Sequence, residues 1–481
     1  MTSAELTFTD AYVDGRWLTG DEPRRPVYDP ASGDVLTEVG VTSGEQCLLA
    51  VDAAHAALAG WAETAPRERS EILRRAYELM SAEQAHLAEL IVLENGKVLA
   101  DAQGEVRYAA EFFRWFAEEA VRVPGDLRRS PMGHNWIMVS HEPVGVALLV
   151  TPWNFPAAMA TRKIAPALAA GCSVVLKPAM ETPLTALAIA DLLRRAGVPR
   201  GVVNVVTPSP AGPAVAAMLA DRRVRALSFT GSTEVGSTLL AAAASNVIRC
   251  SMELGGNAPF LVLDDADVAD AVDGLIVAKM RNGGAACTAA NRILVQRGVA
   301  DDFVEQLIAR MTALTVGSGL DTNTDVGPMV STVELTRVQE LVARSVRNGA
   351  RLHANSNLPG SRGYYHAPSV LTDVRPDDPI LRQEVFGPVA PVVVFDTIED
   401  GVRLANDTDA GLVAYLYTQG LERGLSVSRR LEAGMVGLNR GLVSDPAAPF
   451  GGIKHSGLGR EGSHEGIQEF LEAKYVATPY V

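Results

Sequence analysis

The sequence is poor in cysteine and has no pattern that would turn cysteine into a cross-link or a metal ligand. Four cysteines occur among 481 residues, at Cys47, Cys172, Cys250 and Cys287, and they show neither C-x-x-C nor Cys/His ligand spacing. We therefore expect neither a disulfide framework nor a metal site. A reducing, cytoplasmic location fits this cysteine usage best.

The sequence also has fewer basic than acidic residues and lacks long hydrophobic runs. Lys and Arg number 43 against 57 Asp and Glu, and the net charge of −14 disfavours binding to nucleic acid or anionic lipid. No stretch reaches the roughly 18 apolar residues of a membrane helix, and residues 1–15 contain no hydrophobic signal segment. We expect a soluble protein that acts on small molecules.

Short apolar runs alternate with helical stretches through the middle of the chain. The runs lie at residues 144–150, 173–176, 202–206, 226–229 and 259–263, and helical stretches such as 184–196 separate most of them. Buried strands that alternate with helices predict a parallel, doubly wound sheet of the α/β class. A second α/β block is expected over residues 267–439, with helices at 300–314 and 333–348.

The flanking segments predict helices and exposed strands. Helical spacing over residues 66–93 ends at the stop signal Asn95-Gly96 and resumes over 104–119. Residues 135–143 alternate apolar and polar side chains, which predicts strands with one exposed face. Residues 472–478 predict a strand with little core left to join, and pairing with another subunit is one possible fate.

Cys287 is the first candidate for chemistry. It follows two glycines and two alanines in R-N-G-G-A-A-C-T-A-A-N-R, which begins at Arg281. Small residues let a substrate carbonyl approach the sulfur closely, and a thiolate adds readily to a carbonyl. On this segment alone, a buried structural cysteine is the alternative interpretation.

Two further polar residues follow predicted strands or precede glycines. Asn154 comes shortly after the strand at 144–150, where a parallel sheet places its ligands, so its amide is a candidate oxyanion donor. A helix cap explains Asn154 equally well. Glu253 precedes a diglycine and is either a base toward water or a solvated turn carboxylate.

Two more clusters have the character of a nucleotide site. The segment F-T-G-S-T-E-V-G from Phe229 combines a strand end, a glycine turn and a helix start, and its backbone N–H groups would hold a pyrophosphate. Its spacing is neither a Walker loop nor a G-x-G-x-x-G fingerprint. The segment E-V-F-G-P from Glu384 fits ribose binding or a plain turn.

Together these clusters resemble the aldehyde dehydrogenase superfamily over nearly the whole chain. Six motifs occur in that family's order: T-P-W-N-F-P from Thr151, K-P-A-x-x-T-P from Lys177, F-T-G-S-T-E-V-G from Phe229, E-L-G-G-N-A-P from Glu253, E-V-F-G-P from Glu384 and P-F-G-G-I-K-H-S-G from Pro449.

The resemblance implies an α/β fold with a Rossmann-type cofactor domain, an α/β catalytic domain and a small β arm that builds dimers or tetramers. The cofactor domain would comprise residues 1–121 and 144–252, the catalytic domain residues 253–455, and the arm residues 122–143 and 456–481.

The resemblance also implies oxidation of an aldehyde to its acid with NAD(P)+ through a cysteine thiohemiacetal and a thioester. Cys287 would be the nucleophile, Asn154 and the Cys287 backbone N–H the oxyanion donors, and Glu253 the base that activates water. The implied cofactor-binding residues are Thr151, Pro152, Trp153, Lys177, Met180, Gly231, Ser232, Glu384 and Phe386.

The substrate residues look like those of the succinate-semialdehyde dehydrogenase branch, in which matching side chains hold the far carboxylate of the substrate. The candidates here are Arg162, Arg281, Ser444 and Phe450. A guanidinium suits that task because it pairs with a carboxylate through two hydrogen bonds, but a structural ion pair is the alternative for either arginine. Three alternatives stay open. The substrate could be another semialdehyde such as glutarate semialdehyde or an uncharged aldehyde, or the protein could be a non-catalytic member of the family.

Several positions depart from the family's pattern. Ala285 replaces the usual Gln, Met280 an aromatic, and Ala289 a second cysteine that serves as a redox switch in some members. Met180 stands where NAD-preferring members often have Glu and NADP-preferring members Ser. Because Met180 does not repel a 2′-phosphate and Lys177 is free to meet one, we expect use of NADP or NAD with NADP favoured.

Overall fold

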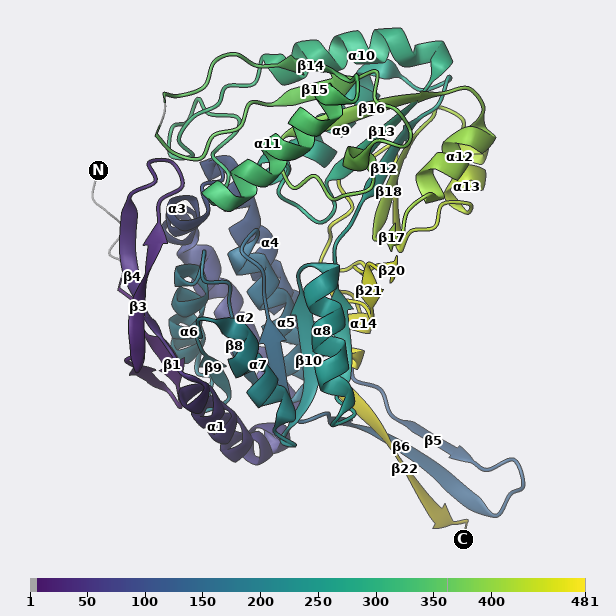
Figure 1. Cartoon of the computed structure of the whole chain (residues 1–481). Helices are drawn as coiled ribbons and strands as arrows, with labels where there is room; N and C mark the ends of the chain where they lie inside the picture. The colour runs from purple at the N-terminus through teal and green to yellow at the C-terminus, as the bar shows by residue number, and fades with distance from the viewer. Residues whose placement is uncertain (1–6, 361, 481) are drawn as a thin grey trace.

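An eight-stranded, mostly parallel sheet organises the first half of the chain (Figure 1). The structure is a computed structural model and describes residues 7–360 and 362–480. The order of the sheet is β2-β1-β9-β8-β7-β10-β11-β21, and the strands from β9 to β11 run parallel. The strands are β1 (Ala11–Val13), β2 (Arg16–Leu18), β7 (Val146–Val150), β8 (Ser173–Lys177), β9 (Val203–Val205), β10 (Val224–Thr230), β11 (Arg249–Glu253) and β21 (Gly457–Leu458).

Helices cover both faces of this sheet, and each strand sends alternate side chains to each face. In β7, Ala147 and Leu149 pack with the helices α2 to α6, whereas Val146, Leu148 and Val150 pack with α1, α7 and α8. The predicted doubly wound α/β class is thereby confirmed. The helices are α1 (Gly44–Glu63), α2 (Pro66–Ala82), α3 (Gln84–Asn95), α4 (Leu99–Glu119), α5 (Pro156–Ala170), α6 (Leu184–Ala196), α7 (Ala211–Ala220) and α8 (Thr233–Ala244).

The strand order reverses next to β7. The chain passes from β7 through β8 to β9 on one side, and then crosses back to place β10 and β11 on the other. In an open parallel sheet such a switch point leaves a crevice beyond the carboxyl ends of the strands, and ligands bind there. The residues that follow β7, β10 and β11 therefore face a natural binding site.

A second sheet organises the other lobe of the molecule (Figure 1). Its order is β14-β15-β16-β13-β12-β18-β19. The strands are β12 (Ala258–Val262), β13 (Ala290–Gln296), β14 (Arg351–Ala354), β15 (Ser369–Thr372), β16 (Val389–Phe395), β18 (Val413–Tyr417) and β19 (Met435–Leu438). Its helices are α9 (Val268–Met280), α10 (Arg297–Thr312), α11 (Thr332–Arg347), α12 (Ile398–Asn406) and α13 (Leu421–Ser428), with short 3-10 turns η1 (Arg281–Gly284) and η2 (Pro379–Leu381).

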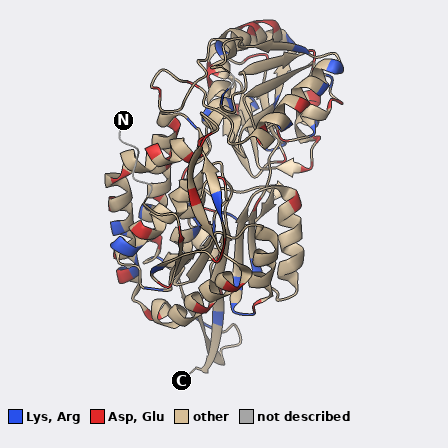
Figure 2. Cartoon of the chain, turned by 60° about the vertical axis from the view of Figure 1, so that its left-hand side comes forward, with Lys and Arg blue, Asp and Glu red and all other residues tan. Residues whose placement is uncertain are grey.

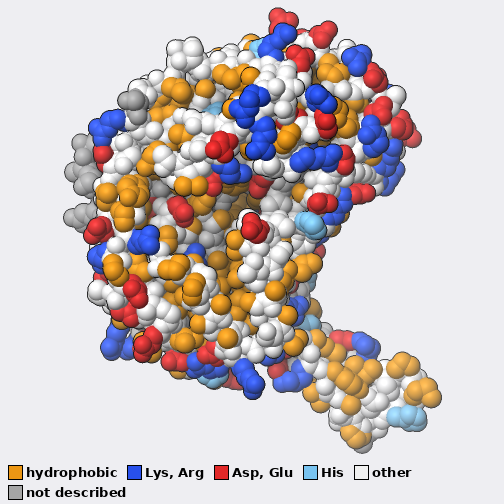
Figure 3. Space-filling model, viewed as in Figure 1, with side chains coloured by type: hydrophobic (Ala, Val, Ile, Leu, Met, Phe, Trp, Pro, Cys, Tyr) orange, Lys and Arg blue, Asp and Glu red, His pale blue; other side chains and the backbone are white. Residues whose placement is uncertain are grey.

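A three-stranded arm projects from the lower lobe (Figures 1 and 3). It consists of β5 (Asp126–Arg129), β6 (Asn135–Pro143) and β22 (Leu471–Pro479), in the order β22-β6-β5. The predicted C-terminal strand thus pairs along its whole length with β6 of its own chain. β22 is an edge strand, and its other edge is not paired with any strand in the described chain.

The remaining elements connect these parts. Strands β3 (Glu22–Tyr28) and β4 (Val35–Val41) form one ribbon, and β17 (Ala410–Gly411) pairs with β20 (Ile453–Lys454). The expected arm range 456–481 differs from the structure in its first part, because β21 joins the eight-stranded sheet and α14 (Glu465–Gln468) contacts α5.

Acidic and basic residues are interspersed over both lobes (Figure 2). None of the helices in the described part of the chain combines the length and the apolar character that crossing a bilayer requires.

Candidate active site

A tight turn between α9 and β13 presents Cys287. Asn282, Gly283 and Gly284 all have left-handed backbone conformations, with φ of 54°, 57° and 83°. A Cβ atom on Gly284 would collide with the carbonyl oxygen of Gly387, so only glycine fits there. A Cβ on Gly256 would likewise collide with the carbonyl oxygen of Cys287. Glycine at both positions lets the cysteine turn pack closely against neighbouring backbone.

Glu253 and Asn154 lie at the carboxyl edge of the first sheet. Glu253 is the last residue of β11, in register with Thr230 of β10. Asn154 follows β7, the strand on the other side of β10. A cavity of about 410 Å³ at this edge brings both residues together with Cys287. Its lining is Pro152, Trp153, Asn154, Thr230, Gly231, Ser232, Glu234, Glu253, Leu254, Gly255, Cys287, Glu334, Arg337, Glu384 and Phe386.

The carboxylate of Glu253 is a poised base. Burial raises the pKa of Glu253 to about 7, although the Arg162 guanidinium, 4.0 Å away, opposes that rise. Both carboxylate oxygens are buried without a hydrogen-bond partner among the described residues. A carboxylate with a pKa near neutrality takes a proton from water and releases it again efficiently.

Cys287 differs from the expectation of a ready thiolate. Burial raises the pKa of the thiol well above its usual range, and the nearby Glu253 carboxylate raises it further, with Arg162 acting in the opposite direction. The sulfur therefore rests as a thiol and needs a proton acceptor before it attacks. Glu253 is a buried carboxylate lining the same cavity.

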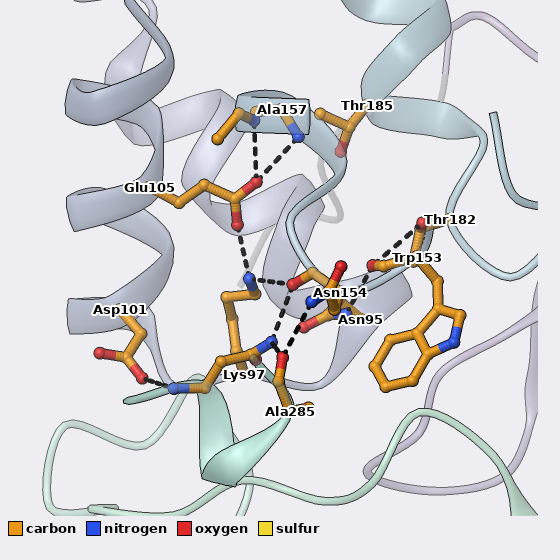
Figure 4. Close-up of polar contacts among 12 residues, drawn as sticks. Asn95, Lys97, Asp101, Glu105, Trp153, Asn154, Ala157, Thr182, Thr185 and Ala285 are labelled. Carbon is orange, nitrogen blue, oxygen red and sulfur yellow. Dashed lines mark hydrogen bonds and ion pairs between the residues drawn. The ribbon is translucent and has the colours of Figure 1, made fainter. Parts of the chain in front are cut away.

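The amide of Asn154 is firmly held on one side. Its Nδ2 donates to the carbonyl oxygen of Ala285 at 3.1 Å, and its own backbone carbonyl accepts from Lys97 Nζ at 2.7 Å and from Asn282 Nδ2 at 2.8 Å (Figure 4). An amide NH₂ has two donors, so one N–H is left for a ligand. Asn154 can therefore donate to an oxyanion formed on a carbonyl bound at Cys287.

The predicted pyrophosphate turn is the N-terminus of α8. The Ser232 hydroxyl caps this helix by accepting from Val235 N at 3.3 Å, and the turn opens into the same cavity. Across the cavity, Glu384 Oε1 accepts from Gly256 N at 3.3 Å, and burial raises the pKa of Glu384 to about 8. Free helix N–H groups suit a pyrophosphate, and an acidic side chain suits a ribose hydroxyl.

Two aromatic rings border the cavity. Trp153 and Phe386 lie with ring centroids 5.3 Å apart at an interplanar angle of 89°. Gly255 is also in the lining, and a Cβ there would come within 3.2 Å of Glu384 Oε2. Flat apolar walls, a helix N-terminus and an acidic side chain fit a nicotinamide dinucleotide.

The remaining predicted cofactor residues lie outside the cavity lining. Lys177 is the last residue of β8, and its carbonyl accepts from Thr151 N at 3.1 Å. Burial lowers the pKa of Lys177, opposed by the charge of Glu181, and no ion pair joins Lys177 to another described residue. Met180 packs against a small apolar cluster that includes Leu90 and Leu184.

The two predicted arginines have different surroundings. Arg162 is buried on α5, with Nε 2.6 Å from Glu461 Oε2 and its guanidinium 4.3 Å from the centre of the Phe450 ring. Arg281 lies 5.0 Å over the ring of Phe155 and forms no ion pair with another described residue. Ser444 is half-buried in the loop before Phe450. None of these four predicted substrate residues lines the cavity that holds Cys287.

Sequence reasoning missed several charged residues around the site. Glu461 pairs with both Arg162 and Lys163, and Lys163 Nζ also donates to Ser228 Oγ at 3.0 Å. Glu334 and Arg337 of α11 line the cavity from the second lobe. Lys97 and Glu105 form a buried pair behind Asn154. Glu461 is distant in sequence from Arg162 and Lys163, and Lys97 from Asn154, so local patterns did not place these residues at the site. Within residues 7–360 and 362–480, no cluster of acidic, His and Cys residues is arranged to hold a metal ion.

The fold and this cavity define a class: an enzyme that combines a thiol, a carboxyl base and an amide donor at the switch point of a dinucleotide-type sheet. A family model described as the aldehyde dehydrogenase family matches residues 17–476. The chain belongs to the aldehyde dehydrogenase family. It is thus an enzyme of the class that oxidises aldehydes with a nicotinamide cofactor, as the motifs predicted.

The similar proteins include enzymes named succinate-semialdehyde dehydrogenase and glutarate-semialdehyde dehydrogenase. A succinate-semialdehyde dehydrogenase of Paenarthrobacter nicotinovorans is 50% identical over 93% of this chain and 100% of its own. A glutarate-semialdehyde dehydrogenase of Pseudomonas putida is 45% identical over 99% of each chain. A crystal structure of an Escherichia coli NADP-dependent enzyme superposes with a TM-score of 0.97 at 44% identity and covers 100% of both chains.

Proposed function

We propose that the protein oxidises succinate semialdehyde to succinate, with NADP preferred over NAD. The observation that carries the proposal is one cavity at the sheet's switch point that is lined by Cys287, Glu253 and Asn154. The similarity to named semialdehyde dehydrogenases supports the substrate class. Arg281, which has no ion-pair partner among the described residues, supports a substrate with a distal carboxylate.

The geometry supports a covalent mechanism. Glu253 takes the proton of the Cys287 thiol, and the sulfur adds to the aldehyde carbon. Asn154 Nδ2 and the Cys287 backbone N–H donate to the oxyanion of the resulting thiohemiacetal. The nicotinamide, when bound, supplies the acceptor for the hydride that leaves this carbon. Glu253 releases the thiol proton to solvent and, ionised again, deprotonates the water that attacks the thioester. The C–S bond then breaks, Cys287 regains a proton and the acid is released.

Residues on both lobes would bind the cofactor. Gly231 and Ser232 at the start of α8 would hold the pyrophosphate, and Glu384 the nicotinamide ribose. Lys177 would hold the adenosine ribose or its 2′-phosphate, beside Met180. Thr151, Pro152, Trp153 and Phe386 would shape the walls of the nicotinamide end.

A comparison of substrates and cofactors tests this function. Purified protein is assayed with succinate semialdehyde, glutarate semialdehyde and butyraldehyde, each with NADP and with NAD. We expect the highest kcat/KM with succinate semialdehyde and NADP. Butyraldehyde matches its length without the carboxylate, so an equal kcat/KM for these two aldehydes would contradict the carboxylate-dependent assignment. Glutarate semialdehyde as the best substrate would favour the second candidate, which the similarity to enzymes of that name supports.

We also propose that the arm joins subunits into a dimer or tetramer. Leu127, Tyr475 and Val476 are exposed on it, and β22 offers an unpaired outer edge in the described chain. Exposed edge strands pair readily with another chain. Truncation after Ala473 removes most of β22 and should yield monomers or aggregates in size-exclusion chromatography with light scattering. Truncation after Thr478 is the control that keeps all of β22 except Pro479, and an unchanged mass after the longer truncation would contradict the proposal.

A further inference from the structure

A buried ion pair lies behind the oxyanion donor. Lys97 follows Gly96, whose left-handed conformation ends α3, and Glu105 lies nearly two turns into α4. Lys97 Nζ donates to Glu105 Oε2 at 2.5 Å, and both side chains are fully buried. Figure 4 shows the pair between α4 and the segment that carries Asn154.

Each member of the pair also forms hydrogen bonds to the backbone on one side of Phe155. Lys97 Nζ donates to the carbonyl oxygen of Asn154 at 2.7 Å. Glu105 Oε1 accepts from Ala157 N at 2.8 Å and from Ala158 N at 3.2 Å, the free N–H groups in the first turn of α5. The pair therefore fixes the backbone on both sides of Phe155, at Asn154 and at Ala157 and Ala158.

The same carbonyl connects to the cysteine turn. Asn282 Nδ2 donates both to Asn154 O at 2.8 Å and to Ala285 O at 3.0 Å, and Ala285 O also receives the Asn154 side chain. Lys97 and Asn282 thus orient one peptide group, and the Asn154 side chain starts from that peptide. A shift of this carbonyl would move the donor relative to Cys287.

A second carboxylate in the molecule shows what a helix cap alone requires. Glu94 is buried and accepts from Leu184 N at 2.8 Å and Thr185 N at 2.9 Å at the start of α6, and no lysine pairs with it among the described residues. A buried carboxylate can thus cap a helix in this fold without a cation. Burying a lysine has a large desolvation cost, which is offset only where a close counter-charge and further hydrogen bonds satisfy the ammonium, as Glu105 and the Asn154 carbonyl do for Lys97.

We propose that Lys97 and Glu105 are positioning residues that hold the Asn154 amide at the place of the oxyanion. This inference rests on the proposed function, because Asn154 matters as a donor only if a carbonyl reacts at Cys287. The two residues touch neither the cavity nor the reacting atoms; they act through the backbone of Asn154.

The test is a double-mutant cycle on kcat. Lys97→Met should lower kcat about 10- to 100-fold, less than or equal to the loss from Asn154→Ala, since one displaced oxyanion donor costs roughly 10²- to 10³-fold. The KM for the aldehyde and the Kd for the cofactor should change less than about twofold. Because both substitutions disable one donor, Asn154→Ala combined with Lys97→Met should be no slower than Asn154→Ala alone.

Two further variants keep the test interpretable. Lys97→Met leaves the Glu105 charge unpaired, so Lys97→Met with Glu105→Gln removes both charges and retains a cap oxygen for α5. Glu94→Gln is the matched control: it weakens a similar buried cap, and it should lower Tm while kcat stays unchanged. A kcat loss for Lys97→Met that multiplies with that of Asn154→Ala, or a kcat equal to wild type, would overturn the proposal.

Two measurements separate this inference from the proposed function. Hydrolysis of 4-nitrophenyl acetate needs the thiol and the oxyanion donor but no cofactor, so the Lys97→Met loss should appear there too. A wild-type protein without either activity would refute the proposed function. A crystal structure of the double variant Lys97→Met with Glu105→Gln then judges positioning by itself: a displaced Asn154 amide supports it, and an unmoved one overturns it.

Discussion

The proposed reacting residues and the predicted carboxylate anchors are arranged in different ways. Cys287, Glu253 and Asn154 come from three separate segments, yet all three line one cavity. Arg162 and Arg281 come from equally recognisable motifs and line none of it. Short side chains at strand ends and tight turns take their position from the backbone. A long arginine side chain is positioned instead by the side chains that it contacts.

The two arginines themselves make the sharper contrast. Arg162 lies among Glu461, Lys163 and Glu253, a compact cluster of buried charges. Arg281 packs on Phe155 and has no such partner in the described chain. The first arginine has its charge already matched inside the protein, and the second is available to a ligand. Variants of each group test how far this division holds.

Cys287→Ala should have the largest effect. Because the sulfur forms the covalent bond, we expect the rate of aldehyde oxidation to fall at least about 10³-fold for charged and uncharged aldehydes alike, with cofactor binding nearly intact. Initial rates and cofactor titration by fluorescence measure both quantities. Cys250→Ala is the control, since Cys250 lies outside the cavity. More than a few percent residual activity in Cys287→Ala would remove the cysteine from its assigned role.

Glu253→Gln should have the next largest effect and change the pH profile. The pKa of Glu253 is about 7, and only the ionised form accepts a proton, so wild-type thioester hydrolysis should rise with pH up to about 7 and level off above it. The variant should lose this rise and hydrolyse the thioester roughly 10²- to 10³-fold more slowly.

Rapid-quench kinetics and mass spectrometry distinguish two roles for Glu253. An acyl adduct that accumulates on Cys287 of Glu253→Gln shows that the carboxylate acts on water. Absence of any adduct would show instead that Glu253 is needed to deprotonate the thiol, whose pKa burial holds well above its usual range.

The strand boundaries show how much of the fold could be predicted from the sequence. The buried runs predicted β7, β8, β9, β10 and β12 to within two residues at either end, because a strand covered on both faces must be apolar throughout. Asn154, Glu253 and Cys287 were candidates because each lies beside a strand end or a glycine turn, and their predicted roles came from the resemblance to the aldehyde dehydrogenase superfamily.

Other features depend on contacts that are distant in sequence. Glu461 meets Arg162 from 299 positions further along the chain, and Lys97 meets Asn154 from the end of another helix. No local pattern identifies such a partner. For the same reason the sequence predicted a strand at 472–478 but not its partner β6, which lies more than 300 positions earlier in the same chain.

Arg281→Met and Arg162→Met should separate the two arginines. Loss of one charge-assisted hydrogen bond to a carboxylate costs about 1.5–3 kcal/mol, so Arg281→Met should lower kcat/KM for succinate semialdehyde about ten- to a hundredfold and hardly affect butyraldehyde. Arg281→Lys keeps the charge but not the planar fork and should recover only part of the loss.

Arg162→Met should act differently, through the protein rather than the substrate. It leaves Glu461 buried with Lys163 alone, and breaking a buried pair costs about 3–5 kcal/mol of stability. We expect a lower denaturation midpoint and similar losses of kcat/KM on both aldehydes. A loss confined to succinate semialdehyde would show that Arg162 leaves Glu461 to bind substrate, and would restore the predicted equivalence of the two arginines.

Met180→Glu should have the smallest effect, a change of cofactor preference. Met180 packs against a small apolar cluster and lies close to Lys177 in the sequence, and it offers a 2′-phosphate neither repulsion nor a hydrogen bond. A carboxylate there would repel that phosphate and accept from the ribose hydroxyls of NAD, so the ratio of kcat/KM for NADP to that for NAD should fall roughly tenfold. Glu181→Gln is the matched control on the next residue, whose charge already acts on Lys177. If Met180→Glu leaves the ratio unchanged while Glu181→Gln alters it, the choice of cofactor lies with Glu181. In that case a charged side chain outside the cavity lining would set the cofactor preference, just as Arg281, also outside that lining, is proposed to set the substrate preference.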